Sequence, residues 1–340
     1  MDIFKILSTK AKKNKRTIIF PESYEPRVIE AVKIALKEKL CKVILIGNDQ
    51  DKFSDPPMKN AGKNNFPDSV QSIFKDNKDL TIIDPAFSKQ FLSEYISIRK
   101  KKAALIPEQA IKELNDPLTF GAMLLRKGYG DGLIAGSIYP TASVIRAGLN
   151  LIGVKKNFKI ISSFFLFTFP KNHVHHDRVF CFADCGVLPE PDEKELAEIA
   201  IQTSDSFKKL TGTKPRTAFL SFSTKGSSAY VGLEKVKSAM KIASKKRKDI
   251  LFDGELQFDA AFDKAVGARK NSDGKIKGDA NIFIFPDLNS GNIGYKIAER
   301  IGGANATGPI LQGFNKPVMD LSRGCSAGDI VNMIKVICNS

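Results

Sequence analysis

Residues 131–146 read DGLIAGSIYPTASVIR, and this stretch decides the fold class. Its apolar run, which ends in small residues at Gly136, is typical of a strand buried on both faces. Hydroxyl-bearing residues then open a helical pattern that reaches Arg146. Strand, turn and helix in this order predict a parallel α/β layer. The same order places backbone amides and a helix N-terminus where an anion can bind, although an ordinary strand-to-helix turn fits these residues equally well.

The same alternation extends over nearly the whole chain. Amphipathic helices are predicted after Pro26, after the acidic segment Asp192–Glu195, around Val236 and from Ile330 onward. The polar segment 51–79 is expected to be loop and short helix. Apolar runs predict strands at Thr17–Phe20, Lys42–Gly47, Leu80–Asp84, Gly132–Gly136, Lys159–Phe169, Arg178–Ala183, Thr217–Phe222 and Asn281–Phe285. These elements together predict α/β layers around mostly parallel sheets.

Length and composition narrow the class of protein. With 340 residues, of which 42% are hydrophobic and 26% charged, about two globular domains are expected. No apolar run reaches the roughly 18 residues of a membrane-spanning helix. The amino terminus has no secretory signal, so we expect a cytoplasmic protein that does not bind membranes. Five scattered cysteines predict neither a disulfide framework nor a zinc site.

The chain is strongly basic, with 53 Lys and Arg against 37 Asp and Glu and a formal charge of +16. The excess is spread along the chain, and no zinc-finger or RNA-binding pattern accompanies it, so no nucleic-acid partner is predicted. A general positive field also attracts phosphorylated metabolites.

A second polar segment, Pro317-Val-Met-Asp-Leu-Ser-Arg-Gly324, brings a serine and an arginine into a loop. A guanidinium forms two parallel hydrogen bonds with a phosphate, although an ordinary turn also explains Ser322 and Arg323. Asp329 follows, where an N-cap residue would stand before the last helix. An aspartate ordinarily has a pKa near 4 and a thiol one near 8.5, so deprotonating a thiol requires a raised pKa or a concerted transfer.

With these segments in view, the sequence resembles the phosphate acetyltransferase (phosphotransacetylase) family over nearly its whole length. The resemblance rests on several long motifs rather than on one short pattern. They include Leu220-Ser-Phe-Ser-Thr-Lys-Gly-Ser227, Asp253-Gly-Glu-Leu-Gln-Phe-Asp-Ala-Ala261, Gly278-Asp-Ala-Asn-Ile-Phe-Ile-Phe-Pro-Asp287, Gly308-Pro-Ile-Leu-Gln-Gly313 and Leu321-Ser-Arg-Gly-Cys325.

The resemblance implies a two-domain α/β fold like that of the isocitrate and isopropylmalate dehydrogenases, with the active cleft between the domains. It places residues 1–157 and 310–340 in the first domain and residues 158–309 in an inserted second domain. A homodimer is the implied assembly.

The implied reaction converts acetyl-CoA and phosphate into CoA and acetyl phosphate without a metal, a cofactor or a covalent enzyme intermediate. Coenzyme A is a substrate. The resemblance gives Asp329 the role of base and Ser322 a hydrogen bond to the reacting groups. Arg323, Arg99 and Arg146 hold the phosphate and offset developing charge. We add Thr141, a hydroxyl at the start of the predicted helix, to the substrate-binding residues.

The sequence departs from the common family pattern at several positions, most of them near the expected site: Met319, Lys101, Tyr139-Pro140, Ser143 and Leu188. Three alternatives to this assignment stay open: a phosphate butyryltransferase acting on longer acyl groups, a non-catalytic domain that binds acetyl-CoA, and a covalent route through Cys185 or Cys325. A fourth alternative, a dehydrogenase, is suggested by the fold alone, and this sequence has no Gly-x-Gly-x-x-Gly motif after a strand to support it.

Overall fold

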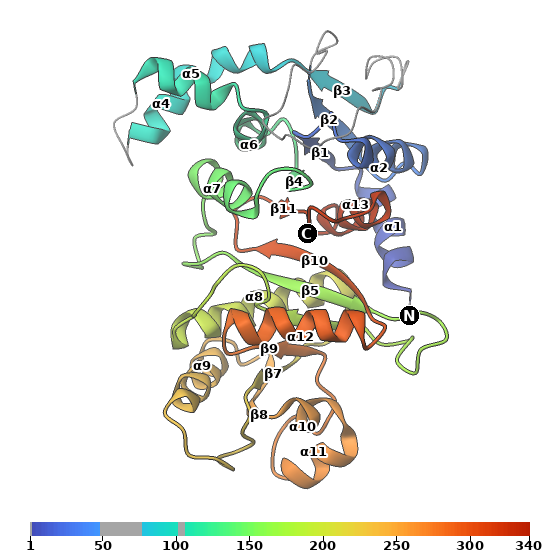
Figure 1. The fold of residues 1–340 in the computed structure, drawn as a ribbon, viewed down its shortest axis with the longest axis vertical. Helices are drawn as coiled ribbons and strands as arrows, with labels where there is room; N and C mark the ends of the chain where they lie inside the picture. Colours follow the sequence, from blue (N-terminus) through green and yellow to red (C-terminus); the bar gives the residue numbers. More distant parts are fainter. Residues whose placement is uncertain (1, 48–76, 101–105) are drawn as a thin grey trace. The chain divides into compact units, whose positions relative to one another are not determined.

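The computed structural model describes residues 2–47, 77–100 and 106–340, and Lys101 and most of the segment 51–79 lie outside them. The chain divides into two compact units. We call residues 8–153 with 318–338 the N-terminal unit, and residues 1–7 with 154–317 and 339–340 the central unit. Each unit is an α/β domain around its own sheet (Figure 1).

The N-terminal unit holds a five-stranded sheet in the order β11-β4-β1-β2-β3, in which all neighbours are parallel. Its strands are β1 (Thr17–Phe20), β2 (Lys42–Ile46), β3 (Leu80–Ile83), β4 (Gly132–Ala135) and β11 (Val318–Asp320). All four residues of β4 are buried, as expected of a central parallel strand.

Helices cover both faces of this sheet. On one face α2 and α13 pack against each other, and on the other α6 packs against α7 (Figure 1). The helices associated with this unit are α1 (Ile3–Asn14, which begins in the central unit), α2 (Pro26–Lys37), the 3-10 helix η1 (Pro85–Phe91), α4 (Leu92–Lys100), α5 (Pro107–Leu114), α6 (Pro117–Lys127), α7 (Thr141–Leu151) and α13 (Ala327–Ile337).

The strand order contains a topological switch point between β1 and β4. From β1 the chain proceeds outward to β2 and β3, and it then returns to place β4 on the other side of β1. Open α/β sheets bind ligands outside the carboxyl ends of their strands at such a point. Residues 131–146 form β4, the following turn and the start of α7, and they therefore lie on one side of this switch point.

The central unit holds a six-stranded mixed sheet in the order β10-β5-β6-β9-β7-β8. Strand β5 is antiparallel to β10 and β6, and the other pairs are parallel. Its strands are β5 (Ser162–Thr168), β6 (Phe180–Ala183), β7 (Arg216–Leu220), β8 (Leu251–Leu256), β9 (Ile282–Ile284) and β10 (Asn305–Gln312).

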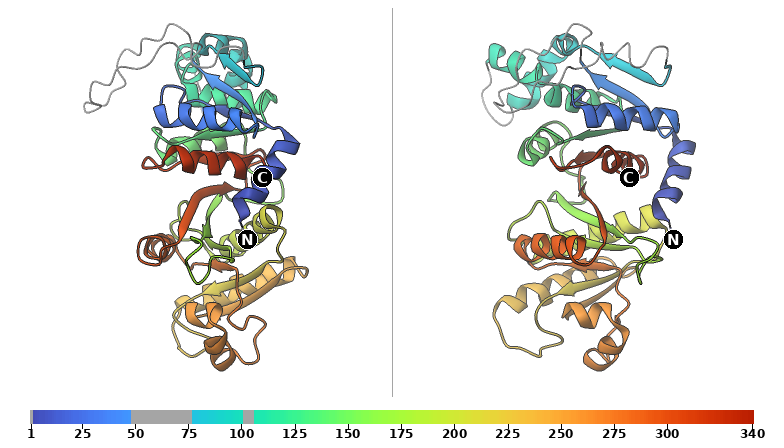
Figure 2. Two further views of the ribbon diagram at one scale, coloured as in Figure 1. Left: turned by 90° about the vertical axis from the view of Figure 1, so that its right-hand side faces the viewer. Right: turned by 45° about the vertical axis from the view of Figure 1, so that its right-hand side comes forward.

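Helices α8 and α9 cover one face of the central sheet and α12 lies on the other (Figure 2). The core contains a cluster of aromatic side chains that includes Phe165, Phe182 and Phe283. The helices are α8 (Glu193–Thr211), α9 (Gly232–Lys246), α10 (Phe258–Phe262), α11 (Lys264–Lys270) and α12 (Leu288–Arg300). Within the described part of the chain, no helix is long and apolar enough to cross a membrane.

All eight predicted strands occur, with ends that differ by up to three residues. Three strands were not predicted: β8, β10 and β11. Each of them lies at an edge of its sheet.

Candidate functional site

Three loops of the N-terminal unit follow the carboxyl ends of neighbouring strands. Residues 21–25 follow β1, residues 136–140 follow β4 and residues 321–326 follow β11. Because β11, β4 and β1 are adjacent and parallel, all three loops emerge at the same edge of the sheet, beside the switch point. These loops carry Ser322 and Arg323 and lead directly into the helices of Thr141, Arg146 and Asp329, so five of the six predicted site residues belong to them.

The backbone amides after β4 already bind a carboxylate of the protein itself. Buried Glu22 accepts hydrogen bonds through Oε1 from the amides of Gly136 (3.2 Å), Ile138 (2.8 Å) and Tyr139 (2.9 Å). Its Oε2 accepts from the Ser137 amide at 3.0 Å and from the Ser137 hydroxyl. The interpretation of this turn as a backbone site for a substrate anion is therefore wrong for these amides, since Glu22 satisfies them.

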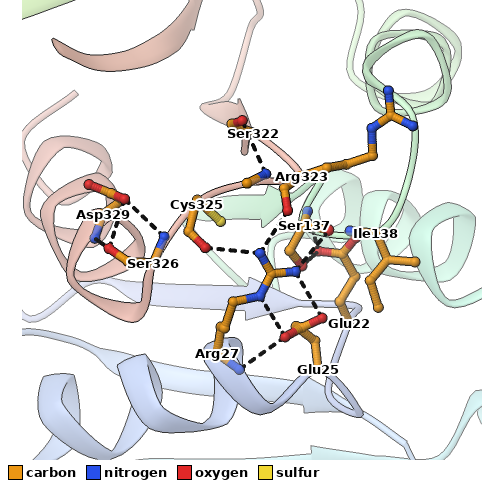
Figure 3. Close-up of polar contacts among 11 residues, drawn as sticks. Glu22, Glu25, Arg27, Ser137, Ile138, Ser322, Arg323, Cys325, Ser326 and Asp329 are labelled. Carbon is orange, nitrogen blue, oxygen red and sulfur yellow. Dashed lines mark hydrogen bonds and ion pairs between the residues drawn. The ribbon is translucent and has the colours of Figure 1, made fainter. Parts of the chain in front are cut away.

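Ser322 and Arg323 are exposed in the loop between β11 and α13. The loop is tightened by a hydrogen bond from the Cys325 amide to the Ser322 carbonyl at 2.9 Å. Among the described residues, no carboxylate forms an ion pair with the Arg323 guanidinium, which extends away from the loop (Figure 3). This cation is therefore available to an anionic ligand.

The other two predicted arginines differ from each other. Arg146 is exposed on α7 and, within the described ranges, has no ion-pair partner. Arg99 lies on α4, where only 19% of its side chain is exposed and its Nε is 3.4 Å from Glu113 Oε2. The Nε of Arg99 is buried and forms no hydrogen bond with any of the described residues. Helix α4 packs against α7, the helix of Arg146.

Thr141 begins α7 and joins it to the end of β11. Its hydroxyl donates a 2.6 Å hydrogen bond to Asp320 Oδ2. Asp320 was not predicted as a site residue, yet it is buried beside the Ser322–Arg323 loop. Burial raises the pKa of the Asp320 carboxyl to about 7, against the lowering effects of Thr141 and Arg323. The only sequence signal was its place before Leu-Ser-Arg.

Asp329 is not the N-cap of α13, and that part of the sequence interpretation is wrong. Ser326 is the N-cap, and Asp329 occupies the third helical position of a capping box. The Asp329 amide donates to Ser326 Oγ at 3.2 Å, while Asp329 Oδ2 accepts from the Ser326 amide (2.9 Å) and hydroxyl (2.7 Å). Both accepted bonds go to Oδ2, so the other oxygen of this exposed side chain is left for another proton.

The cysteines do not have the environment of nucleophiles. Burial raises the pKa of the Cys325 thiol to about 11 and that of Cys185 well above its ordinary value, so both are protonated at neutral pH. The described residues contain no cluster of His, Cys, Asp or Glu able to hold a metal ion. The three histidines lie in the turn before β6, in the central unit.

Several of the long sequence motifs form polar networks inside the central unit. Lys225 donates to Asp253, whose carboxylate also accepts from the amides of Gly254, Lys275 and Ile276. Asp184 similarly accepts from three successive amides, ending at Leu188. Only the backbone of Leu188 makes this contact, so the departure from the family pattern there leaves it intact.

Comparison with known proteins agrees with this architecture. The family described as Phosphate acetyl/butaryl transferase matches residues 2–338. Over 337 residues the chain is 41% identical to the phosphate acetyltransferase of Thermoanaerobacterium thermosaccharolyticum, covering 98% of each protein. The crystal structure of a phosphotransacetylase from Streptococcus pyogenes matches with a TM-score of 0.87 at 38% identity, covering 99% of this chain and 97% of that one.

A more distant likeness bears on the fold alone. A putative 4-hydroxythreonine-4-phosphate dehydrogenase from Salmonella typhimurium matches with a TM-score of 0.50 at 12% identity, over 96% of this chain and 99% of that one. The predicted dehydrogenase-like α/β fold is thereby confirmed, whereas dehydrogenase activity has no support. By its family match and its relatives, the chain belongs to the phosphate acetyl/butaryl transferase family and is an acyltransferase.

Proposed function

We propose that the chain is a phosphate acetyltransferase that interconverts acetyl-CoA plus phosphate and CoA plus acetyl phosphate. The observation that carries the proposal is the guanidinium of Arg323, which is exposed in the Ser-Arg-Gly loop at the carboxyl end of β11 and has no ion-pair partner among the described residues. A cation available to a ligand at this edge of a parallel sheet suits a phosphorylated substrate. The names of the relatives that are about 40% identical support acetyl as the group transferred.

In the proposed reaction the CoA sulfur attacks the acetyl carbonyl of acetyl phosphate directly. The carbon–sulfur bond forms, the bond from carbon to the phosphate oxygen breaks, and phosphate leaves. Arg323 and Arg146 bind the phosphate, and Arg99 joins them if its contact with Glu113 yields to the substrate. Ser322 donates a hydrogen bond to the reacting groups. Placing both substrates together supplies much of the rate.

Asp329 takes the thiol proton through the oxygen that the capping box does not use. An aspartate is ordinarily a weaker base than a thiolate, so the proton leaves the sulfur while the new bond forms. Coenzyme A and phosphate are substrates, and the proposal requires no metal and no further cofactor. We further propose that the enzyme is a homodimer.

The test mixes the purified protein with acetyl phosphate and CoA, without added metal, and follows thioester formation by ultraviolet absorbance. CoA-dependent thioester formation that phosphate inhibits is the expected result. Butyryl phosphate in parallel reactions measures acyl preference, and a faster rate with butyryl would make the enzyme a phosphate butyryltransferase. No thioester with either substrate would leave a binding domain without catalysis.

A further inference from the structure

The loops at the switch point are joined by a polar brace that we define as the buried Glu22 with the partly buried Glu25 and Arg27. All three residues come from the segment between β1 and the first turn of α2. Figure 3 shows Arg27 lying between the loop of Ser137 and the loop of Arg323. None of the three was predicted from the sequence as a functional residue.

Arg27 uses all of its donors inside the protein. Nη1 donates to the carbonyls of Arg323 (2.7 Å) and Cys325 (2.9 Å), and Nη2 donates to the carbonyl of Ser137 at 3.2 Å. Nε and Nη2 also donate to the two carboxylate oxygens of Glu25, at 2.7 and 3.0 Å. A guanidinium has five N–H groups, and these contacts occupy five.

This saturation distinguishes Arg27 from the arginines proposed to bind phosphate. Its charge is offset by Glu25, and the hydrogen bonds between them raise the pKa of Arg27. Burial alone would raise the pKa of Glu25, but the hydrogen bonds from Arg27 outweigh it and lower that pKa. Arg27 therefore has neither an unpaired charge nor a free donor for a substrate anion.

Its three carbonyl contacts join two loops that are far apart in sequence. Ser137 belongs to the loop that leads into α7, the helix of Thr141 and Arg146, whereas Arg323 and Cys325 belong to the loop after β11. Glu22 holds the first loop from the other side through its amides. The first loop is thus fixed by both its amides and a carbonyl.

We propose that Arg27 is a positioning residue, which holds the Arg323 loop at a fixed place relative to the loop leading into α7. Arg323 is anchored through its own carbonyl while its side chain stays free for phosphate (Figure 3). The role rests on the proposed function. Only a planar fork reaches three carbonyls and a carboxylate together, so lysine cannot replace Arg27.

The experiment compares Arg27→Ala and Arg27→Lys with the wild type in the acetyl phosphate and CoA assay. We expect kcat to fall about 100-fold in both variants, because a displacement on the order of 1 Å costs that much. The KM for acetyl phosphate should change far less, since Arg27 does not touch the substrate. Guanidinium chloride, below concentrations that unfold the protein, should partly restore kcat in Arg27→Ala but not in Arg27→Lys.

The matched control is Arg247→Ala in the central unit. Arg247 also pairs with carboxylates, those of Asp205 and Asp249, but contacts neither loop. The Arg247→Ala variant should keep the kcat of the wild type, and added guanidinium should not change that kcat. Hydrogen exchange measured with the Arg27 variants should show faster exchange at residues 322–325 and 136–139 than in the wild type.

An active wild type with unaltered kcat in Arg27→Lys would overturn the positioning role and leave the proposed function standing. A loss of kcat that guanidinium does not restore in Arg27→Ala, accompanied by the unfolding of both variants, would show that Arg27 serves stability alone. A wild type that forms no thioester would overturn the proposed function and this role together.

Discussion

At the scale of single residues, Asp329 combines two uses of one carboxylate. Its Oδ2 accepts both capping hydrogen bonds from Ser326, so helix capping and proton transfer do not compete for the same oxygen. Asp329 thus stands in the first turn of α13 as a capping residue whose second carboxylate oxygen is not used by the cap.

Two substitutions separate these uses. Asp329→Asn should lower kcat by roughly 100-fold or more, the usual contribution of a general base. Ser326→Ala removes the N-cap and should cost about 1 kcal/mol of stability, with a much smaller effect on kcat. Steady-state kinetics and thermal unfolding of both variants measure the difference. Equal losses of stability with unchanged kcat would mean that Asp329 only caps α13.

Asp320 makes stability depend on pH. Its pKa in the folded protein is raised to about 7, mainly by burial, and Glu22 adds to the rise while Thr141 and Arg323 oppose it. A raised carboxyl pKa means that the folded state disfavours the ionised form. The contribution of Asp320 to the free energy of unfolding is therefore most favourable below about pH 4, and it is lost as the pH rises to about 7.

Asp320→Asn removes this dependence. Relative to the wild type, the variant should gain on the order of 2 kcal/mol in unfolding free energy between about pH 5 and about pH 8. Urea unfolding at the two pH values measures the gain. Asp249→Asn, at an exposed carboxylate of the central unit, is the control for general charge effects. A gain of the same size in that control would show that Asp320 is not the titrating group.

At the scale of elements, the turn after β4 depends on a glycine. Gly136 has a φ of +106°, which side chains with a Cβ rarely adopt, and a Cβ there would meet Asp320 Oδ1 and the backbone of Leu321. The turn passes close to the end of β11 because Leu321 donates its amide to the Ala135 carbonyl at 2.7 Å.

Gly136→Ala should therefore be destabilising by more than about 2 kcal/mol, from backbone strain plus the clash. Gly212→Ala is a matched control, since Gly212 has a φ of +71° but open space around its Cβ position. It should show the strain alone, about 1 kcal/mol. The shifts in thermal midpoint measure both. Equal shifts would argue against close packing between the β4 turn and β11.

The strands that the sequence did not predict lack a continuous apolar run. Strand β8 includes Asp253, Gly254 and Glu255 among its buried residues, and β11 has only three residues, one of them Asp320. Strand β10 contains Gly308 and Pro309, where its register with β5 shifts. The interior strands β1 and β4 are buried at most positions, so their apolar runs made them recognisable.

The sequence predicts part of the candidate site because some of its residues are close together along the chain. Ser322, Arg323 and Asp329 sit in one short segment, so a family motif contains them. The brace was missed because its partners are separated by up to 298 positions, as between Arg27 and Cys325. Periodicity and motif spacing carry no information about contacts between an arginine and the backbone carbonyls of distant loops.

At the scale of the whole molecule, the formal charge of +16 favours the approach of phosphorylated substrates. Salt weakens such long-range attraction, because the screening length falls from about 30 Å at about 0.01 M to about 8 Å at about 0.15 M. Over this range of salt concentration, kcat/KM for acetyl phosphate and for CoA should fall, while kcat should change little because bound substrate is already at the site.

Replacing KCl with tetramethylammonium chloride distinguishes screening from a specific effect of the cation. If kcat/KM stays constant while salt is varied, the net charge has no part in substrate capture, and binding depends on the local arginines alone.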